Sequence, residues 1–182
     1  MRLFTALDLT PEVAGRLADL VERLRPAARI AWSPPTNLHI TTKFIGEWPE
    51  DRLEELLAAL AAIEGRVPIP VRVGGLGFYP NARAPRVFWC GVEAPGLAEL
   101  AGETDAATAR LGIQSEKRAY SPHLTLARIR ERVDLRILQE RVAALDTVDL
   151  GRFEARSFFL YRSQLRPAGS LYTKLAEFPL SK

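Results

Sequence analysis

The stretch Leu38-His39-Ile40-Thr41-Thr42 has a close counterpart in the second half of the chain, Pro122-His123-Leu124-Thr125-Leu126. Each contains a histidine and a threonine separated by one apolar residue, and these are the only two histidines of the 182 residues. Because side chains alternate between the two faces of a strand, histidine and threonine at this spacing point to the same side. The pattern predicts two equivalent strands that each present an imidazole and a hydroxyl group on one face.

The same order of elements surrounds both motifs: a helix, the histidine strand, a second helix and two further strands. Apolar spacing and turn residues place helices at 11–24, 53–63, 97–111 and 135–145, and strands at 1–9, 38–45, 67–73, 86–92, 122–129, 148–161 and 171–178, with a glycine- and proline-rich loop over 74–85. We therefore predict a single bilobal domain over residues 1–182, with an internal repeat of roughly residues 11–92 and 96–178.

The predicted fold class is α+β, with two antiparallel sheets that carry helices on their outer faces. A pseudo-two-fold axis would relate the two lobes and leave an active-site cleft between them. Such an axis would bring His39 and His123, with Thr41 and Thr125, together from opposite sides of the cleft.

Composition is that of an ordinary globular protein, with 47% hydrophobic residues, 26% charged residues and a net charge of +3. No apolar run approaches the roughly 20 residues that a membrane-spanning helix needs, and the first residues do not resemble a secretion signal. We expect a cytoplasmic monomer with no membrane contact. Cys90, the only cysteine, lies in an apolar strand segment and is expected to be an inert core thiol.

Two histidines suit paired general acid and base catalysis, because the ordinary pKa of histidine is close to neutral. Hydrolysis of a phosphodiester needs one group on each side of phosphorus, which a site with two-fold symmetry supplies. The threonine hydroxyls could donate hydrogen bonds to the other phosphate oxygens. We predict no metal and no cofactor, because two histidines and one cysteine do not form a typical zinc site and no phosphate-binding loop motif is present. A Ser-His-Asp site stays open but would not explain the second motif.

Regular alternation assigns the residues that follow the first motif. Lys43 shares the parity of His39 and is expected to line the cleft, whereas Phe44 is expected in the core.

At these residues the sequence resembles the RNA 2′,3′-cyclic phosphodiesterase family, historically called 2′-5′ RNA ligases, within the two-histidine phosphoesterase superfamily. The matching segments are residues 34–46, 120–128, 160–165 and 169–172. The resemblance implies metal-independent hydrolysis of a terminal RNA 2′,3′-cyclic phosphate to a 2′-phosphomonoester. It also implies that His39 protonates the leaving 3′-oxygen, that His123 activates water, and that Thr41 and Thr125 hold the phosphate. The residues alone leave the acid and base roles interchangeable.

Further contacts with the RNA 3′ end follow from the same resemblance. Arg128 matches an arginine of the family and could contact phosphate if the strand bulges or ends before it; otherwise its role is structural. Aromatic residues could stack on a terminal base, and those considered are Tyr120, Trp32, Phe78 and Tyr79. The linear charge pattern suggests contact with the last one or two nucleotides of an RNA end or short oligonucleotide.

Three alternatives remain open at this point. The same site could join RNA ends through a 2′-5′ bond, or hydrolyse a small cyclic-phosphate nucleotide. The chain could also bind RNA ends without catalysis.

Overall fold

The computed structural model describes residues 1–63, 67–167 and 169–180. Its strands and helices follow in the order β1 (Arg2–Leu7), α1 (Pro11–Leu24), β2 (Ala31–Trp32), β3 (Ile40–Glu47), α2 (Leu53–Ala61), β4 (Ile69–Tyr79), β5 (Val87–Glu93), α3 (Leu97–Ala109), β6 (His123–Arg128), α4 (Arg136–Ala143), β7 (Asp149–Ala155), β8 (Ser157–Arg166) and β9 (Gly169–Pro179). All four expected helices are present. None of the helices in the described ranges has the length and apolar character needed to cross a bilayer.

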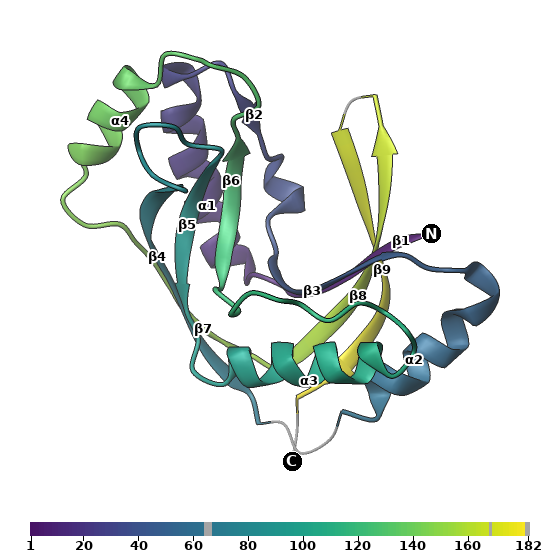
Figure 1. Cartoon of the computed structure of the whole chain (residues 1–182). Helices are drawn as coiled ribbons and strands as arrows, with labels where there is room; N and C mark the ends of the chain where they lie inside the picture. Colours follow the sequence, from purple (N-terminus) through teal and green to yellow (C-terminus); the bar gives the residue numbers. More distant parts are fainter. Residues whose placement is uncertain (64–66, 168, 181–182) are drawn as a thin grey trace.

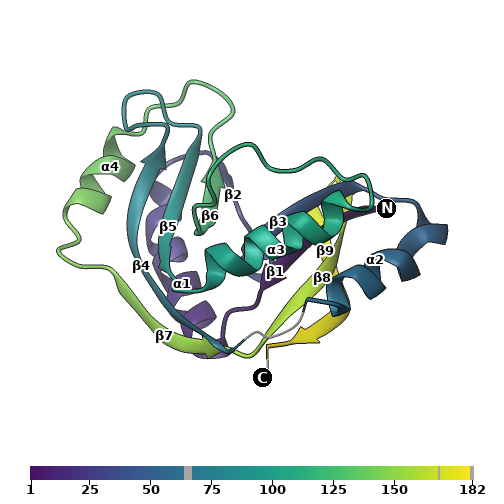
Figure 2. The same cartoon turned by 60° about the horizontal axis from the view of Figure 1, so that its bottom comes forward.

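The strands form two separate antiparallel sheets, which confirms the α+β prediction (Figure 1). One sheet has four strands in the order β3-β1-β8-β9, and the other has five in the order β2-β6-β5-β4-β7. Helix α3 contacts β3 and α2 contacts β9, whereas α1 contacts β7 of the other sheet (Figure 2). The main core of buried side chains lies between these helices and the sheets.

Each sheet takes strands from both halves of the chain. The segment expected as one strand over 148–161 is two strands, because β7 and β8 are separated at Arg156 and enter different sheets. The lobes are therefore not the two halves of the sequence, since the chain passes repeatedly from one sheet to the other. The internal repeat itself stays a prediction.

The first half of the glycine-rich segment expected as a loop belongs to a strand. β4 continues through Gly74 and Gly75 to Tyr79, with an irregularity in its pairing to β5 between Val73 and Leu76. Gly75 has φ of +74°, and a Cβ on Gly74 would lie 2.5 Å from the Val148 carbonyl oxygen. These glycines permit a bulge and a close approach of the backbones rather than ending the strand.

Both histidine strands contain a bulge directly after the motif threonine. In the pairing of β1 with β3, Ala6 faces Thr41 and Thr5 faces Lys43, so Thr42 is the extra residue. In the pairing of β5 with β6, the register passes from Thr125 to Ala127, so Leu126 is the extra residue. Each bulge reverses the side-chain alternation of the residues beyond it.

Candidate active site

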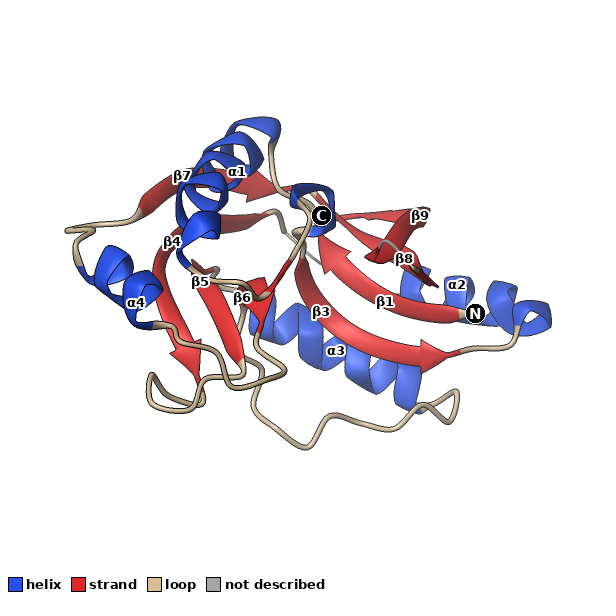
Figure 3. Cartoon of the chain, turned by 90° about the horizontal axis from the view of Figure 1, so that it is seen from above, coloured by secondary structure: helices blue, strands red, loops and turns tan. Residues whose placement is uncertain are grey.

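The strands that carry the two histidine motifs contact each other where the two sheets come together. His39 immediately precedes β3 and His123 begins β6, and these strands contact each other although they belong to different sheets (Figure 3). The Tyr120 hydroxyl donates a hydrogen bond of 2.8 Å to the backbone carbonyl of Thr41. The segment that leads into the second motif is thereby attached to the first.

The contact of His123 with a backbone carbonyl determines which of its ring nitrogens carries the proton. Its Nδ1 lies 2.9 Å from the Ser121 carbonyl oxygen, and its side chain is exposed. Because a carbonyl oxygen can only accept, this contact requires the proton on Nδ1. In the neutral ring Nε2 then carries the free lone pair, which is the tautomer that a general base needs.

His39 is in a drier environment, with 12% of its side chain exposed. Burial lowers its pKa from the ordinary 6.5, because the charged ring loses hydration. The Asn37 carbonyl and the Asp8 carboxylate oppose this effect, whereas the Lys174 ammonium adds to it. Its Nδ1 is buried and makes no hydrogen bond of normal geometry within the described residues.

Asp8 lies beside His39 and accepts hydrogen bonds from two other side chains. One carboxylate oxygen accepts a 2.5 Å hydrogen bond from the Tyr161 hydroxyl and lies 3.9 Å from His39 Nε2. The other oxygen accepts a 2.6 Å hydrogen bond from Lys174 Nζ. The carboxylate is therefore held beside the imidazole by donors from β8 and β9, without forming a direct hydrogen bond to it.

The motif threonines have free hydroxyl groups and occupied carbonyl groups. Thr41 and Thr125 are half-buried, and within the described ranges neither side-chain oxygen bonds to another residue. The Thr125 carbonyl accepts a 2.7 Å hydrogen bond from Ser33 Oγ, as the Thr41 carbonyl does from Tyr120. Both carbonyls lie beside a bulge, where ladder bonding is disrupted, and each accepts from a side chain. Both hydroxyls remain available to a ligand.

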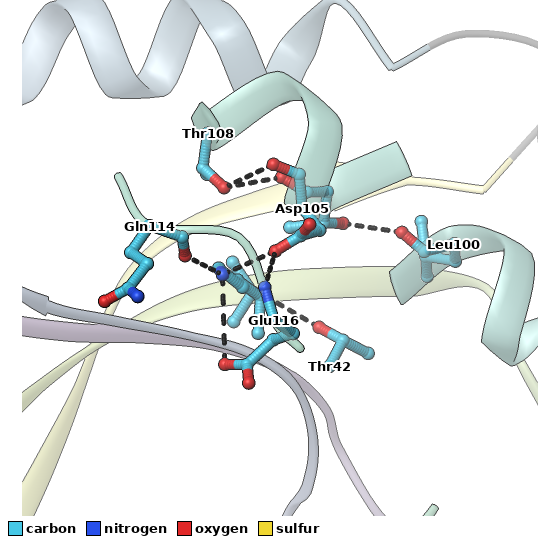
Figure 4. Close-up of polar contacts among 9 residues, drawn as sticks. Thr42, Leu100, Asp105, Thr108, Gln114 and Glu116 are labelled. Carbon is cyan, nitrogen blue, oxygen red and sulfur yellow. Dashed lines mark hydrogen bonds and ion pairs between the residues drawn. The ribbon is translucent and has the colours of Figure 1, made fainter. Parts of the chain in front are cut away.

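The prediction that Lys43 lines the site is wrong. The bulge at Thr42 turns Lys43 to the opposite side of the sheet, where its side chain is 1% exposed. Its ammonium donates to Asp105 of α3 at 2.5 Å and to the Gln114 carbonyl at 2.8 Å, and lies 3.8 Å from Glu116 (Figure 4). Lys43 fastens α3 and the following loop to the back of β3.

The bulge also brings Phe44 to the His39 side, which corrects its expected place in the core. Phe44 is 46% exposed and stacks on Phe4 at a centroid distance of 6.0 Å. Phe4, Tyr161 and Tyr172 all have ring contacts with His39, at 6.4, 4.6 and 5.9 Å between centroids. His39 thus borders an aromatic cluster that is separate from the main core.

Of the other residues expected at the site, Arg128 is exposed, whereas the aromatic residues Tyr120, Trp32 and Phe78 are held by neighbouring groups. Arg128 is exposed and, because of the bulge at Leu126, shares the face of His123. Tyr120 is half-buried with its hydroxyl engaged, and burial raises the pKa of that hydroxyl. Trp32 and Phe78 pack against Phe88, edge-on and stacked respectively. RNA contacts of Arg128 and Tyr120 stay predictions.

Sequence reasoning missed Asp8, Tyr161 and Lys174 as neighbours of His39. They lie far from it in the chain, just after β1, on β8 and on β9 respectively. Tyr161 stands in a segment that carried the family resemblance, but no local pattern connected it with the histidine. In the described part of the chain, no three histidine, cysteine, aspartate or glutamate side chains converge so that they could hold a metal ion.

The chain matches the family model described as LigT like Phosphoesterase, over residues 7–89 and again over 91–172. Curated relatives include the RNA 2′,3′-cyclic phosphodiesterase of Methanocaldococcus jannaschii, 35% identical over 98% of this chain and 100% of the relative. That of Thermus thermophilus is 35% identical over 99% of this chain and 90% of the relative.

Solved structures show the same likeness. A Thermus thermophilus protein superposes with a TM-score of 0.84 at 32% identity, covering 99% of this chain and 98% of that one. Escherichia coli LigT complexed with 3′-AMP gives a TM-score of 0.77 at 26% identity, covering 100% of this chain and 98% of that one.

Proposed function

The chain belongs to the LigT-like phosphoesterase family, and from this premise we propose that it hydrolyses the 2′,3′-cyclic phosphate at the 3′ end of RNA to a 2′-phosphomonoester. Full-length relatives at about one-third identity carry the name RNA 2′,3′-cyclic phosphodiesterase. The observation that carries the proposal is the free Nε2 of His123, which the Ser121 contact fixes, in a site shared with His39.

His123 and His39 take opposite proton-transfer roles in this reaction. Nε2 of His123 removes a proton from water as its oxygen bonds to phosphorus. The bond from phosphorus to the 3′-oxygen breaks on the far side, and His39 gives that oxygen a proton. The phosphate remains on the 2′-oxygen. Burial lowers the pKa of His39 overall, and the Asp8 carboxylate opposes this effect, so Asp8 favours the protonated ring that the acid role needs without reversing the net shift.

The phosphate is held by groups that face the same junction. The unbonded hydroxyls of Thr41 and Thr125 can donate to the two non-bridging oxygens, where negative charge increases in the transition state. Arg128 lies on the same face of β6 as His123 but at the far end of the strand, where it supplies a cation for the RNA beyond the reacting phosphate. Phe44 exposes its ring beside the aromatic cluster around His39, so it can pack against the terminal base.

Product analysis tests this proposal. A short RNA ending in a 2′,3′-cyclic phosphate would be incubated with the protein in excess EDTA, and the product followed by phosphorus NMR. We expect a 2′-phosphomonoester as the product. A 3′-phosphate would contradict the leaving-group assignment. Binding without turnover would favour an RNA-end binding protein, and a 2′-5′ linked product would favour ligation.

A further inference from the structure

The five-stranded sheet continues beyond the two catalytic groups that it carries. Residues directly opposite one another in an antiparallel pair point to the same face. Gly91 is opposite His123, Trp89 is opposite Thr125, and Val87 is opposite Arg128. On the next strand Gly77 is opposite Trp89 and Tyr79 is opposite Val87. We call this surface the His123 face; it comprises His123, Thr125, Arg128, Gly91, Trp89, Val87, Gly77 and Tyr79.

The Trp89 indole lies flat across this face. A Cβ on Gly77 would fall 2.1 Å from the Trp89 ring, and one on Gly91 would fall 3.5 Å from it. Only glycine at position 77 lets the ring rest against the neighbouring strand. Trp89 is half-buried and lies outside the main cluster of core side chains, whereas its neighbours Phe88 and Cys90 belong to that cluster. The indole therefore presents a flat apolar surface beside Thr125. This ring is not part of the packing of the main core.

Arginines gather where the His123 face ends. Arg86 donates to the Arg130 carbonyl at 3.4 Å, and Arg118 lies 3.5 Å from the Tyr79 hydroxyl. The group comprises Arg83, Arg86, Arg118, Arg128, Arg130 and Arg132, all exposed. Within the described ranges none of them pairs with a carboxylate, whereas Arg16, Arg52, Arg72 and Arg156 all do.

We propose that the His123 face binds the RNA chain that precedes the terminal nucleotide, with Trp89 stacking on a base and Arg86 and Arg130 contacting phosphates. Single-stranded RNA is commonly bound by aromatic platforms beside cationic side chains. From His123 to Arg128 the strand spans up to about 16 Å at about 3.3 Å per residue, which is too far for the terminal nucleotide alone. The linear charge pattern predicts contact with only one or two nucleotides. It does not show that these arginines, which are spread over the sequence, lie close together in the fold.

This proposal rests on the proposed function, and it is tested by how activity depends on RNA length. Substrates of one, two, four and eight nucleotides, each ending in a 2′,3′-cyclic phosphate, would be compared by kcat/KM at several salt concentrations. We expect kcat/KM to rise with length in the unmodified protein. Substituting Arg86→Gln and Arg130→Gln together should reduce the ratio between the longest and shortest substrates. It should also lower the salt dependence by about 0.7 logarithmic units per decade of salt for each phosphate that the variant no longer binds.

Trp89→Leu should reduce the same ratio about fivefold or more without changing the salt dependence, because stacking carries no charge. The matched control substitutes Arg152→Gln and Arg156→Gln, which are exposed residues on and beside β7 at the other edge of the sheet. The control should keep the length dependence of the unmodified protein. Since Arg86 and Arg130 are exposed, their substitution tests the proposal even if Trp89→Leu does not fold.

Equal kcat/KM for all lengths, or equal loss in the control, would overturn the proposal while leaving the phosphodiesterase function intact. If no substrate is hydrolysed, the proposed function fails, and the face is then tested by fluorescence anisotropy with the eight-nucleotide RNA. Weaker binding in the Arg86 and Arg130 variant than in the control would support the face as a binding surface. Equal binding would overturn it.

Discussion

The charge state of His39 depends on two residues that act in opposite directions. The Asp8 carboxylate raises its pKa and the Lys174 ammonium lowers it, while burial has the largest effect and lowers it. We expect its pKa to lie below 6.5, to fall further in Asp8→Asn and to rise in Lys174→Gln. The protonated form of His39, and with it the acid step, is lost as the pH rises through this pKa.

Proton NMR titration measures these shifts directly, because the chain has only two histidines and His123→Asn assigns both resonances. In the pH profile of kcat/KM, the limb where activity falls as His39 loses its proton should shift in the same direction as the His39 pKa. An unchanged pKa of His39 in Asp8→Asn would show that the carboxylate does not set its charge.

At this scale the sequence predicted the residues with a local signature and missed those without one. The spacing of His39 and Thr41 is visible within three residues, and it recurs at His123 and Thr125. Asp8 and Lys174 become neighbours only because β1 and β9 join one sheet with β8 between them. No periodicity within the chain encodes that contact.

At the scale of single strands, a bulge explains the two side-chain assignments that were wrong. Regular alternation fails for Lys43 and Phe44 because Thr42 is an extra residue, and the corresponding bulge at Leu126 places Arg128 on the His123 face. From the sequence alone, Arg128 could either contact phosphate, if the strand bulged or ended before it, or have a structural role. A bulge depends on the pairing strand, so one strand's sequence does not reveal it.

The ion pair of Lys43 and Asp105 gives an asymmetric stability prediction. Asp105→Ala leaves a buried ammonium without its main partner and should cost about 3 kcal/mol of unfolding free energy. Lys43→Met should cost less than about 1.5 kcal/mol, because Met fills the space and Asp105, 21% exposed, keeps the Glu116 amide as a donor. Urea unfolding measures both values. A larger loss in Lys43→Met would contradict the role of burial.

The same pair makes stability depend on pH. Burial alone would raise the pKa of Asp105, but hydrogen bonds from Lys43 and the Glu116 amide outweigh it and lower the pKa. The folded state then favours the ionised carboxylate, so this contribution is present at neutral pH and is lost as the pH falls through the folded pKa. The difference in unfolding free energy between the unmodified protein and Lys43→Met should therefore shrink in acid.

At the scale of the whole molecule, each of the two sheets contains strands from both halves of the chain. The sequence predicted the helices and most strand segments from apolar spacing and proline and glycine positions. It did not show that β7 and β8 part at Arg156, because one residue between two strands carries no local signal of separate sheets. Sheet membership is a matter of long-range pairing.

The Tyr120 hydroxyl links the segment before the second histidine motif to the first motif, across the boundary between the two sheets. Tyr120→Phe should lower the unfolding free energy by about 1 kcal/mol, because the Thr41 carbonyl loses a donor at the bulge. Amide hydrogen exchange over residues 114–122 should become faster. Tyr79→Phe is the matched control, since Tyr79 is 53% exposed and should leave the unfolding free energy unchanged. Equal effects of the two substitutions would show that the link contributes nothing.

The division of proton transfer between His39 and His123 is tested by changing the leaving group. Single-turnover hydrolysis would be compared for an RNA 2′,3′-cyclic phosphate and for the analogue with sulfur at the 3′-bridging position, whose thiolate leaves without a proton. On the oxygen substrate, His39→Ala and His123→Ala should each reduce the rate by a factor of about 100 to 10,000 while circular dichroism stays unchanged. On the sulfur substrate His39→Ala should recover most of its rate and His123→Ala should not. Recovery in His123→Ala instead would reverse the two roles, and full activity of either variant on the oxygen substrate would contradict catalysis by a histidine pair.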